Sequence, residues 1–373
     1  MAKPLKLLHV FPTFAVGGAQ RRFATLANAI GPELEHVVIS LDGGGGAENL
    51  IRPGIRLRRR AATARQARGL SPRDLRAFRG ALREERADLL VTYNWGAIEW
   101  ALADRFRPIC PHLHVVDGFG PEEAIKQLPR RVWLRRLALS GPTTVVVPSR
   151  ALHRLVIENW KLDPAKVRHI PNGVDAAALA REAREPWGLR RGSDEFLFGT
   201  LGGLRPEKNL GRLLRVAAML PKDLRWRLVI AGADGQRADL EAEAQAAGLT
   251  ERVTFTGFVD RPGALLCELD LYVLTSDTEQ MPISVLEAMA VGLPVLATDM
   301  GDLRVMLPAG SRSTCVFARE EEKAFADRLA ALLAAPDERR RLGDLNRAQA
   351  AEFSLEAMVA SYDRLFRELA GRP

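Results

Sequence analysis

The chain has 373 residues, 47% of them apolar, which is enough for two domains with full-sized cores. No apolar run approaches the ~20 residues of a membrane-spanning helix, and three widely spaced cysteines fit a reducing cytoplasm better than a disulfide framework. The net charge is uneven: residues 1–185 carry 30 Lys and Arg against 18 Asp and Glu, whereas residues 186–373 carry 24 against 28. A basic first half indicates a polyanionic partner, such as nucleic acid, an anionic membrane or a phosphorylated substrate, although solvated arginine-rich helix faces explain individual arginines equally well.

Short β-branched runs alternate with helical patterns along the chain. In the first half, this pattern predicts strands at 5–10, 36–41, 88–92, 112–116, 143–147 and 167–170, and helices at 19–30, 72–86, 96–106 and 149–159. In the second half, it predicts strands at 196–201, 226–231, 252–256, 271–275, 294–298 and 313–317, and helices at 208–220, 236–248, 282–291 and 320–334.

Alternating strands and helices are typical of parallel sheets covered by helices on both faces. The alternation occurs twice, so we expect an α/β protein with two Rossmann-like, doubly wound domains. We place the first domain at 1–178 and the second at 179–353, with the join inside the stretch 172–195. Residues 354–373 contain a last amphipathic helix, which we expect to pack back toward the first domain.

The most informative segment, 271–298, predicts a strand, a polar loop, a helix opening at Pro282 and ending at Gly292, and another strand. The helix N-terminus would then face the edge of the sheet where open α/β folds bind ligands, and its free amides suit a diphosphate. Glu279 and Glu287 are eight positions apart, about two helical turns, so both carboxylates can face one ligand and accept hydrogen bonds from its hydroxyls. As isolated residues, they could equally be solvated.

This segment resembles the Glu-x7-Glu signature of retaining family 4 glycosyltransferases, including the following Ala-Met-Ala-Val-Gly-Leu-Pro-Val at 288–295. The resemblance implies the GT-B architecture, in which two Rossmann-like domains face a central cleft. It assigns Glu279 to the donor sugar and Glu287 to the nucleotide ribose. Gln280 stands where the family commonly has glycine. By the same resemblance, the donor site would also include Met281, Pro282 and Ile283.

A glycine-rich turn at 199–209 follows the first strand of the predicted second domain, and Lys208 would open the next helix. A cation there can neutralise charge on a departing diphosphate. Gly203 stands where the family usually has arginine, and Arg205 could supply that charge or point away. The resemblance also places Gly232, Phe258 and Val259 at strand ends that hold the nucleotide base.

The first predicted domain offers a glycine pair, Gly17 and Gly18, directly after its first strand. Arg21 and Arg22 fit a basic wall of this domain, and we expect Arg21 to bind the acceptor. Glycines there let the backbone approach a ligand, and a purely structural turn is the alternative. In the family, this loop lies near the donor phosphates and the acceptor. No Gly-x-Gly-x-x-Gly follows the first strand, which argues against a nicotinamide enzyme.

Two polar clusters follow strands of the first domain and suit an acceptor site: Tyr93, Asn94 and Trp95, and then Asp117. Asp117 would contact a sugar hydroxyl at the place where the family often has a histidine motif. His114, three residues earlier, is a further catalytic candidate or an ordinary strand residue. His112 and His114 lack a third ligand nearby, so we expect no metal site.

Residues 128–139 form a helix-length stretch of arginine pairs, apolar residues and Trp133. Such a stretch can lie on an anionic membrane surface, or it can be a basic helix packed through its apolar side chains.

Together, these features predict a retaining glycosyltransferase that transfers a sugar from a UDP- or GDP-linked donor to a glycan or lipid-diphosphate-linked acceptor. We expect a role in bacterial surface polysaccharide or glycolipid synthesis, a cytoplasmic location with peripheral membrane attachment, no cofactor, no protein-bound metal and no nucleic-acid partner. The catalytic candidates are Glu279, Lys208, Asp117 and His114. The alternatives are a sugar-nucleotide epimerase of the same fold and a nucleic-acid-binding protein, against which the acidic second half and the lack of a recognised module count.

Overall fold

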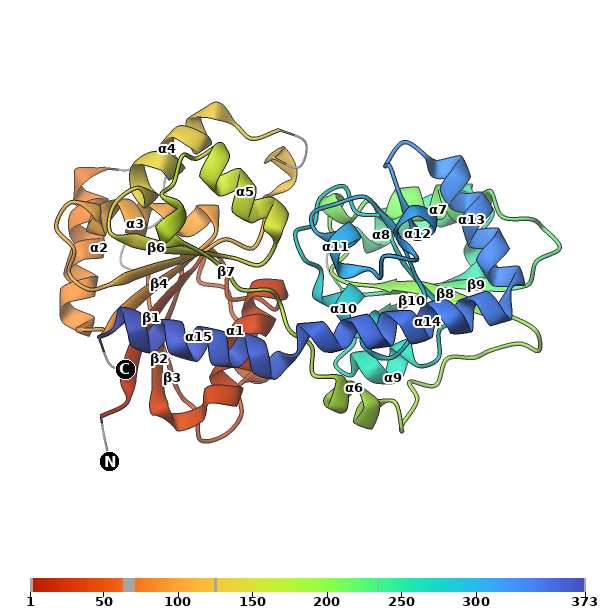
Figure 1. The fold of residues 1–373 in the computed structure, drawn as a ribbon, viewed down its shortest axis with the longest axis horizontal. Coiled ribbons are helices and arrows are strands. Elements are labelled where there is room, and N and C mark those ends of the chain that lie inside the picture. Colours follow the sequence, from red (N-terminus) through yellow and green to blue (C-terminus); the bar gives the residue numbers. More distant parts are fainter. Residues whose placement is uncertain (1–2, 63–70, 124–125, 234, 372–373) are drawn as a thin grey trace. The chain divides into compact units, whose positions relative to one another are not determined.

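A computed structural model describes residues 3–62, 71–123, 126–233 and 235–371 (Figure 1). The chain divides into two compact units, which we call the first unit (Met1–Asn172 with Glu356–Pro373) and the second unit (Gly173–Leu355). Within the described residues, no helix is both long and apolar enough to cross a membrane.

The first unit is built on a parallel sheet whose strand order reverses beside its first strand. In spatial order, its described strands are β3 (Arg56–Arg60), β2 (Leu34–Ser40), β1 (Leu5–Phe11), β4 (Leu89–Tyr93), β5 (His112–Val115), β6 (Thr143–Val147) and β7 (Val167–His169). The longer helices of this unit are α1 (Gly18–Ile30), α2 (Pro72–Glu85), α3 (Ile98–Arg105), α4 (Pro129–Leu139), α5 (Arg150–Glu158) and the C-terminal α15 (Leu355–Leu369).

Helices cover both faces of this sheet, because its central strands are apolar on both sides. On one face, Leu8 and Val10 of β1 pack in one buried cluster with Phe78 of α2 and Trp100 of α3. On the other face, Phe23 of α1 lies edge-on to the ring of Phe11. Figure 1 shows α1 and α15 together on this second face.

The second unit repeats the same plan with a smaller sheet. In spatial order, its described strands are β10 (Val253–Gly257), β9 (Trp226–Ala231), β8 (Phe196–Leu201), β11 (Leu271–Leu274), β12 (Val295–Thr298) and β13 (Val316–Phe317), and all pairs are parallel. Its helices are α6 (Ala176–Glu182), α7 (Leu210–Ala218), α8 (Arg237–Ala246), α9 (Pro262–Leu266), α10 (Ile283–Ala290), α11 (Leu303–Met306), α12 (Arg312–Cys315), α13 (Glu322–Ala334) and α14 (Pro336–Ala350).

The predicted α/β class with two doubly wound sheets is confirmed, and the predicted strands up to 294–298 lie within two residues of the observed ones. The strand expected at 313–317 is largely wrong. Residues Arg312–Cys315 form a helical turn instead, in which the Thr314 amide donates a hydrogen bond to the Ser311 carbonyl. Only Val316–Phe317 pairs with β12.

Strand β3 and helix α14 are among the elements that were not predicted, because neither shows a clear apolar period. The edge strand β3 is mostly arginine, and its side chains find carboxylates: Arg60 donates to Glu85 at 2.7 Å and to Glu84 at 2.5 Å. Helix α14 is strongly polar, and its backbone approaches Gly292 closely at Gly343, where a Cβ would overlap the carbonyl oxygen of Gly292.

Four buried histidines lie inside the first sheet and form hydrogen bonds between strands. His9 contacts Tyr93 Oη at 3.1 Å and His36 at 3.0 Å, while Thr92 Oγ1 lies 2.8 Å from both His112 and His114. Burial lowers the pKa of His36 to about 4 and of His112 to about 3, and it lowers those of His9 and His114 well below their usual value. All four therefore stay neutral in the folded state.

We expect the free energy of unfolding to fall as the pH drops below about 6.5, the ordinary histidine pKa. Below that pH, the unfolded chain binds protons that the native state does not, whereas above it both states are neutral and the term vanishes. Together, the four histidines should lower the free energy of unfolding by up to about 4 kcal/mol between pH 6.5 and 5.5. Urea unfolding across this range measures the slope, and His112→Gln should reduce it by about a quarter. A flat profile would contradict this account.

Candidate functional site

In the second unit, two loops meet where the strand order reverses. β8 has β9 on one side and β11 on the other, so the loops after β8 and β11 leave the sheet at its topological switch point. Open α/β sheets bind ligands at this point, outside the carboxyl ends of the strands. Lys208 lies on the first loop and Glu279 on the second.

The Lys208 ammonium forms an ion pair with Glu279 Oε1, and Ser276 Oγ donates a hydrogen bond of 3.0 Å to the same oxygen. The Lys208 side chain is 23% exposed and that of Glu279 is 12% exposed, so both remain reachable by a ligand. The structure therefore brings together these two predicted residues, which are distant in the sequence.

Further bonds hold the two loops against each other. The Asp277 amide donates to the Glu207 carbonyl at 2.9 Å, and Asn209 Nδ2 donates to Asp277 Oδ2 at 2.9 Å. Asn209 has a left-handed backbone, and its side chain also caps α7 by accepting from the Arg212 amide. Lys208 therefore lies in a 3-10 turn ahead of the helix, and the prediction that it opens the helix is wrong.

A buried arginine supports the loop after β11 from below. Arg212 donates to the Thr275 carbonyl at 2.7 Å and pairs with Asp277 Oδ1 at 2.7 Å. Glu322, at the start of α13, accepts from Arg215 at 2.6 Å and lies 3.5 Å from Arg212 Nε. This network was not predicted, because its members lie on α7, on α13 and on the loop after β11, which are distant in the sequence.

Two glycines shape the backbone around the site. Gly301 has φ +51°, and a Cβ there would overlap the carbonyl oxygens of Glu279 and Gln280. The neighbouring Asp302 amide donates to the Gln280 carbonyl at 2.9 Å. Gly232, after β9, approaches the loop after β8 so closely that a Cβ would overlap the Gly202 carbonyl oxygen. Only glycine fits such approaches without moving the loops.

The other predicted donor residues surround these loops. Pro282 immediately precedes α10, Met281 is buried beside it, and Ile283 begins the helix. Glu287 lies partly buried on α10, Phe258 is exposed after β10, and Val259 is buried. The Gly203 carbonyl accepts a hydrogen bond from the Arg205 amide at 2.9 Å, while the exposed Arg205 side chain lies 3.8 Å from Glu207.

In the first unit, Asp117 and Asn94 follow neighbouring strands and bind each other. The Asp117 amide donates to Asn94 Oδ1 at 2.7 Å, and Asn94 Nδ2 lies 3.5 Å from Asp117 Oδ2. Asp117 also forms an ion pair with Arg22 of α1. The sequence analysis singled out the adjacent Arg21, which is half-buried, as the acceptor-binding arginine, and did not give that role to Arg22.

The other predicted residues of the first unit differ in how deeply they are buried. Tyr93 is buried and stacks on Phe11 with a ring-centroid distance of 3.8 Å. His114 is buried, and its Nδ1 lies 2.8 Å from Thr92 Oγ1. The guanidinium Cζ atoms of Arg131 and Arg135 on α4 lie over the Trp95 ring, 5.0 and 4.9 Å from its centroid. Gly17 and Gly18 form the start of α1.

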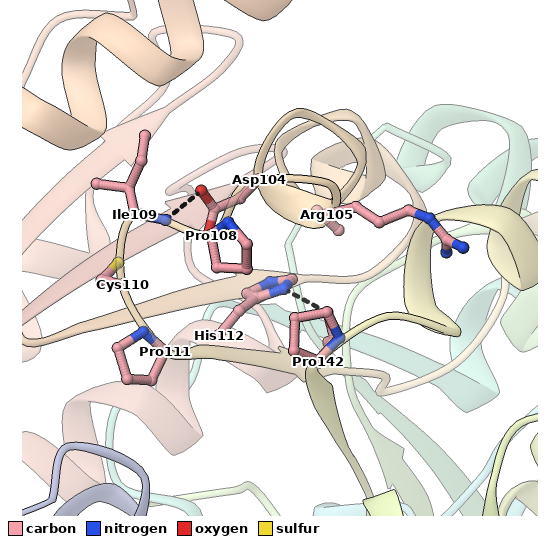
Figure 2. Close-up of a pocket in the computed structure, with 10 residues that line it drawn as sticks. Asp104, Arg105, Pro108, Ile109, Cys110, Pro111, His112 and Pro142 are labelled. Carbon is pink, nitrogen blue, oxygen red and sulfur yellow. Dashed lines mark hydrogen bonds between the residues drawn. The ribbon is translucent and has the colours of Figure 1, made fainter.

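A pocket of about 440 Å³ opens at the opposite, amino-terminal edge of the first sheet (Figure 2). Its walls come from α3, the loop after it and the starts of β5 and β6, and include Asp104, Pro108, Cys110, His112 and Pro142. Asp104 Oδ1 accepts from the Ile109 amide at 2.9 Å, and both ring nitrogens of His112 contact threonine hydroxyls. Asp104 and His112, two polar residues of this pocket, therefore already form hydrogen bonds within the protein.

Among the described residues, no three His, Cys, Asp or Glu side chains gather as ligands of one ion would.

Comparisons with known proteins place both units in one class, the glycosyltransferases of GT-B fold. Residues 17–173 match the glycosyl transferase 4-like domain, and residues 182–349 match the domain of glycosyl transferases group 1. Since these two matches account for most of the chain, it belongs to the family 4 glycosyltransferases.

Three similar proteins illustrate this membership. A D-inositol 3-phosphate glycosyltransferase of Mycobacterium avium is 29% identical over 332 residues, which are 80% of this chain and 76% of the relative. An Escherichia coli UDP-Gal:alpha-D-GlcNAc-diphosphoundecaprenol alpha-1,3-galactosyltransferase is 27% identical over 59% of each chain. The structure of Anabaena HepE in complex with UDP and glucose shares the fold, with a TM-score of 0.82 at 18% identity over 98% of this chain and all of that one.

We expect Gly301→Ala to weaken nucleotide binding, because the added methyl group must displace the backbone of Glu279 and Gln280 and disfavours the positive φ. The loss in unfolding free energy should be about 1–3 kcal/mol. Gly310→Ala is the matched control, since a Cβ there meets no atom within 4 Å. Calorimetric titration of UDP and GDP on both variants checks this expectation, and equal affinities would contradict it.

Proposed function

We propose that this glycosyltransferase is a retaining enzyme that uses a UDP- or GDP-linked sugar and transfers the sugar to a glycan or a lipid-diphosphate-linked acceptor. The second unit would bind the donor and the first unit the acceptor. The product would belong to a bacterial surface polysaccharide or glycolipid.

The observation that carries the proposal is the Lys208–Glu279 ion pair at the switch point of the second sheet. A lysine held beside a carboxylate, close to the loop that leads into α10, can exchange that carboxylate for a diphosphate. The charge that develops on a leaving nucleoside diphosphate would then be neutralised by Lys208 and by the free amides at the start of α10. Arg205 would add charge only after leaving Glu207.

Glu279 and Glu287 would fix the position of the donor through its hydroxyl groups. Once Lys208 turns to the diphosphate, the Glu279 carboxylate can accept hydrogen bonds from sugar hydroxyls, with Ser276 keeping its orientation at 3.0 Å. Glu287, partly buried on α10, would accept bonds from the ribose hydroxyls. The acceptor hydroxyl would attack the anomeric carbon from the face that the diphosphate leaves. The diphosphate departs with the bonding electrons, and the hydroxyl proton passes to it.

The acceptor assignment rests on charge and on Asp117. Residues 1–185 carry the positive charge of the chain, which suits an acceptor with a diphosphate group. Asp117 offers a carboxylate at the carboxyl edge of the sheet for an acceptor hydroxyl. The Escherichia coli relative, by its name, acts on a diphosphoundecaprenol-linked sugar, which supports this class of acceptor.

An anionic membrane surface is the proposed second partner, through residues 128–139. Helix α4 exposes Arg130, Trp133 and Arg136, which fall on one helical face, and Phe106 is exposed at the end of α3. The two helices meet there, because Arg105 bonds to Ser140 Oγ at 2.7 Å. Aromatic side chains flanked by arginines suit the interface of an anionic bilayer.

We expect one nucleoside diphosphate or its sugar conjugate to raise the melting temperature of the wild-type protein, since a ligand that binds only the folded state stabilises it. Glu287→Ala should lose most of this shift, whereas Glu251→Ala, at an exposed position of the same unit, should keep it. A thermal-shift screen of UDP, GDP, ADP and their common sugar conjugates makes the measurement. If no nucleotide stabilises the wild type, the donor assignment fails.

We expect the product to keep the anomeric configuration of the donor, and the rate to be unchanged by EDTA, because the lysine takes the place of a metal at the diphosphate. Proton NMR of the isolated product, read from the anomeric coupling, measures the configuration. An inverted linkage or an EDTA-sensitive rate would overturn the corresponding part of the proposal. Sugar conversion without any acceptor would indicate an epimerase instead.

A further inference from the structure

A buried arginine in the first unit links four segments that are distant in the sequence. Arg22 of α1 is only 4% exposed. Its guanidinium pairs with Asp117 after β5, donates to Asn172 Oδ1 after β7 at 3.2 Å, and lies 5.8 Å from the ring centroid of Tyr362 on α15. An arginine so deeply buried needs compensation of its charge, and Asp117 is the carboxylate that provides it.

The partner carboxylate is held but not enclosed. Asp117 receives Arg22 on Oδ1, Asn94 Nδ2 lies 3.5 Å from Oδ2, and its amide is bound by Asn94 Oδ1 at 2.7 Å. Its side chain nevertheless remains 19% exposed, in contrast to the buried Arg22. The arrangement therefore fixes the direction of the carboxylate while leaving it open to a ligand.

The C-terminal helix completes this arrangement. Tyr362 lies fully buried on α15, with its ring over the guanidinium, and α15 is anchored at its far end by the ion pair between Arg367 and Glu33. A ring face over a desolvated guanidinium is attractive and limits where the arginine can lie. The Tyr362 hydroxyl has no hydrogen-bond partner among the residues that the structure describes, so the ring and not the hydroxyl makes the contact.

We propose that Arg22 is a positioning residue, held by Tyr362 of the C-terminal helix, that fixes the Asp117 carboxylate for a hydroxyl of the acceptor. The inference rests on the proposed function, because it assumes that the first unit binds the acceptor. The acceptor hydroxyl would donate to an ionised carboxylate whose orientation is set by the Arg22 pair. The last helix of the chain is then part of the support of the acceptor site.

Arginine suits this position better than lysine would. Its planar guanidinium reaches Asp117 and Asn172 with separate nitrogens and presents a flat face to Tyr362. A lysine ammonium could neutralise Asp117, but it has no planar group to lie under the ring and no fixed fork for two acceptors. Arg22→Lys should therefore keep the protein folded while misplacing the carboxylate.

The test is a steady-state analysis of full-length variants with the donor and acceptor used by the wild type. Arg22→Lys and Tyr362→Leu should raise the KM for the acceptor about tenfold and leave the KM for the donor within about twofold. Tyr362→Phe keeps the ring and should behave as the wild type. Arg154→Gln, at an exposed position of α5, is the control for removing an arginine charge.

A double-mutant cycle separates positioning from stability. Arg22→Gln and Asp117→Asn should each lower the melting temperature, and the double variant should recover part of the loss because neither charge is left unpaired. The acceptor KM of the double variant should stay as high as that of Asp117→Asn.

Melting temperatures that fall while the acceptor KM stays at its wild-type value would show a merely structural pair and overturn the inference. A wild-type protein that transfers no sugar would instead refute the proposed function.

Discussion

The account depends on the contact between two loops of the second unit. The loop after β8 and the loop after β11 are far apart in the sequence, but they leave adjacent strands at the same edge of one sheet. Backbone and side-chain bonds between Glu207, Asn209 and Asp277 hold them together, and the Lys208–Glu279 ion pair adds a further contact between the same two loops. A lysine and a carboxylate held in this way can exchange partners with a diphosphate at little cost in ordering, because their loops are already fixed.

The first unit has a similar sheet topology but presents different side chains at its carboxyl edge. Its carboxyl edge presents Asp117, held by Asn94 and Arg22, instead of a lysine–glutamate pair. Beneath this edge, the sheet contains buried histidines that contact one another, a tyrosine and threonines on neighbouring strands. The two units of this family 4 glycosyltransferase therefore present different polar groups on one kind of scaffold.

The sequence predicted the architecture well, because buried parallel strands and amphipathic helices have clear periods. It also singled out Lys208 and Glu279, which the fold brings into contact. It missed β3 and α14, where arginine-rich or polar segments hide the period, and it placed a strand where residues 312–315 form a helical turn.

Residues that act through long-range contacts were beyond its reach. Arg22 is one of two adjacent arginines, and nothing local distinguishes the buried one from its neighbour. Gly301 shows its role only through the carbonyl oxygens that it meets. His114 was a catalytic candidate by its place near a strand end, yet helices cover both faces of the sheet and bury every residue of β5, which local spacing does not reveal.

The most direct test of the central claim is calorimetric titration of nucleoside mono- and diphosphates, UMP against UDP and GMP against GDP, on the wild type, Lys208→Ala and Lys222→Ala. Lys222 is exposed and lies between α7 and the start of β9, at the opposite edge of the sheet from the two loops, so its removal controls for the loss of one positive charge. The account predicts that, for one base, the wild type and Lys222→Ala bind the diphosphate about tenfold or more tightly than the monophosphate, and that Lys208→Ala loses this preference while keeping its affinity for the monophosphate. A preference for the diphosphate that survives in Lys208→Ala would contradict the account.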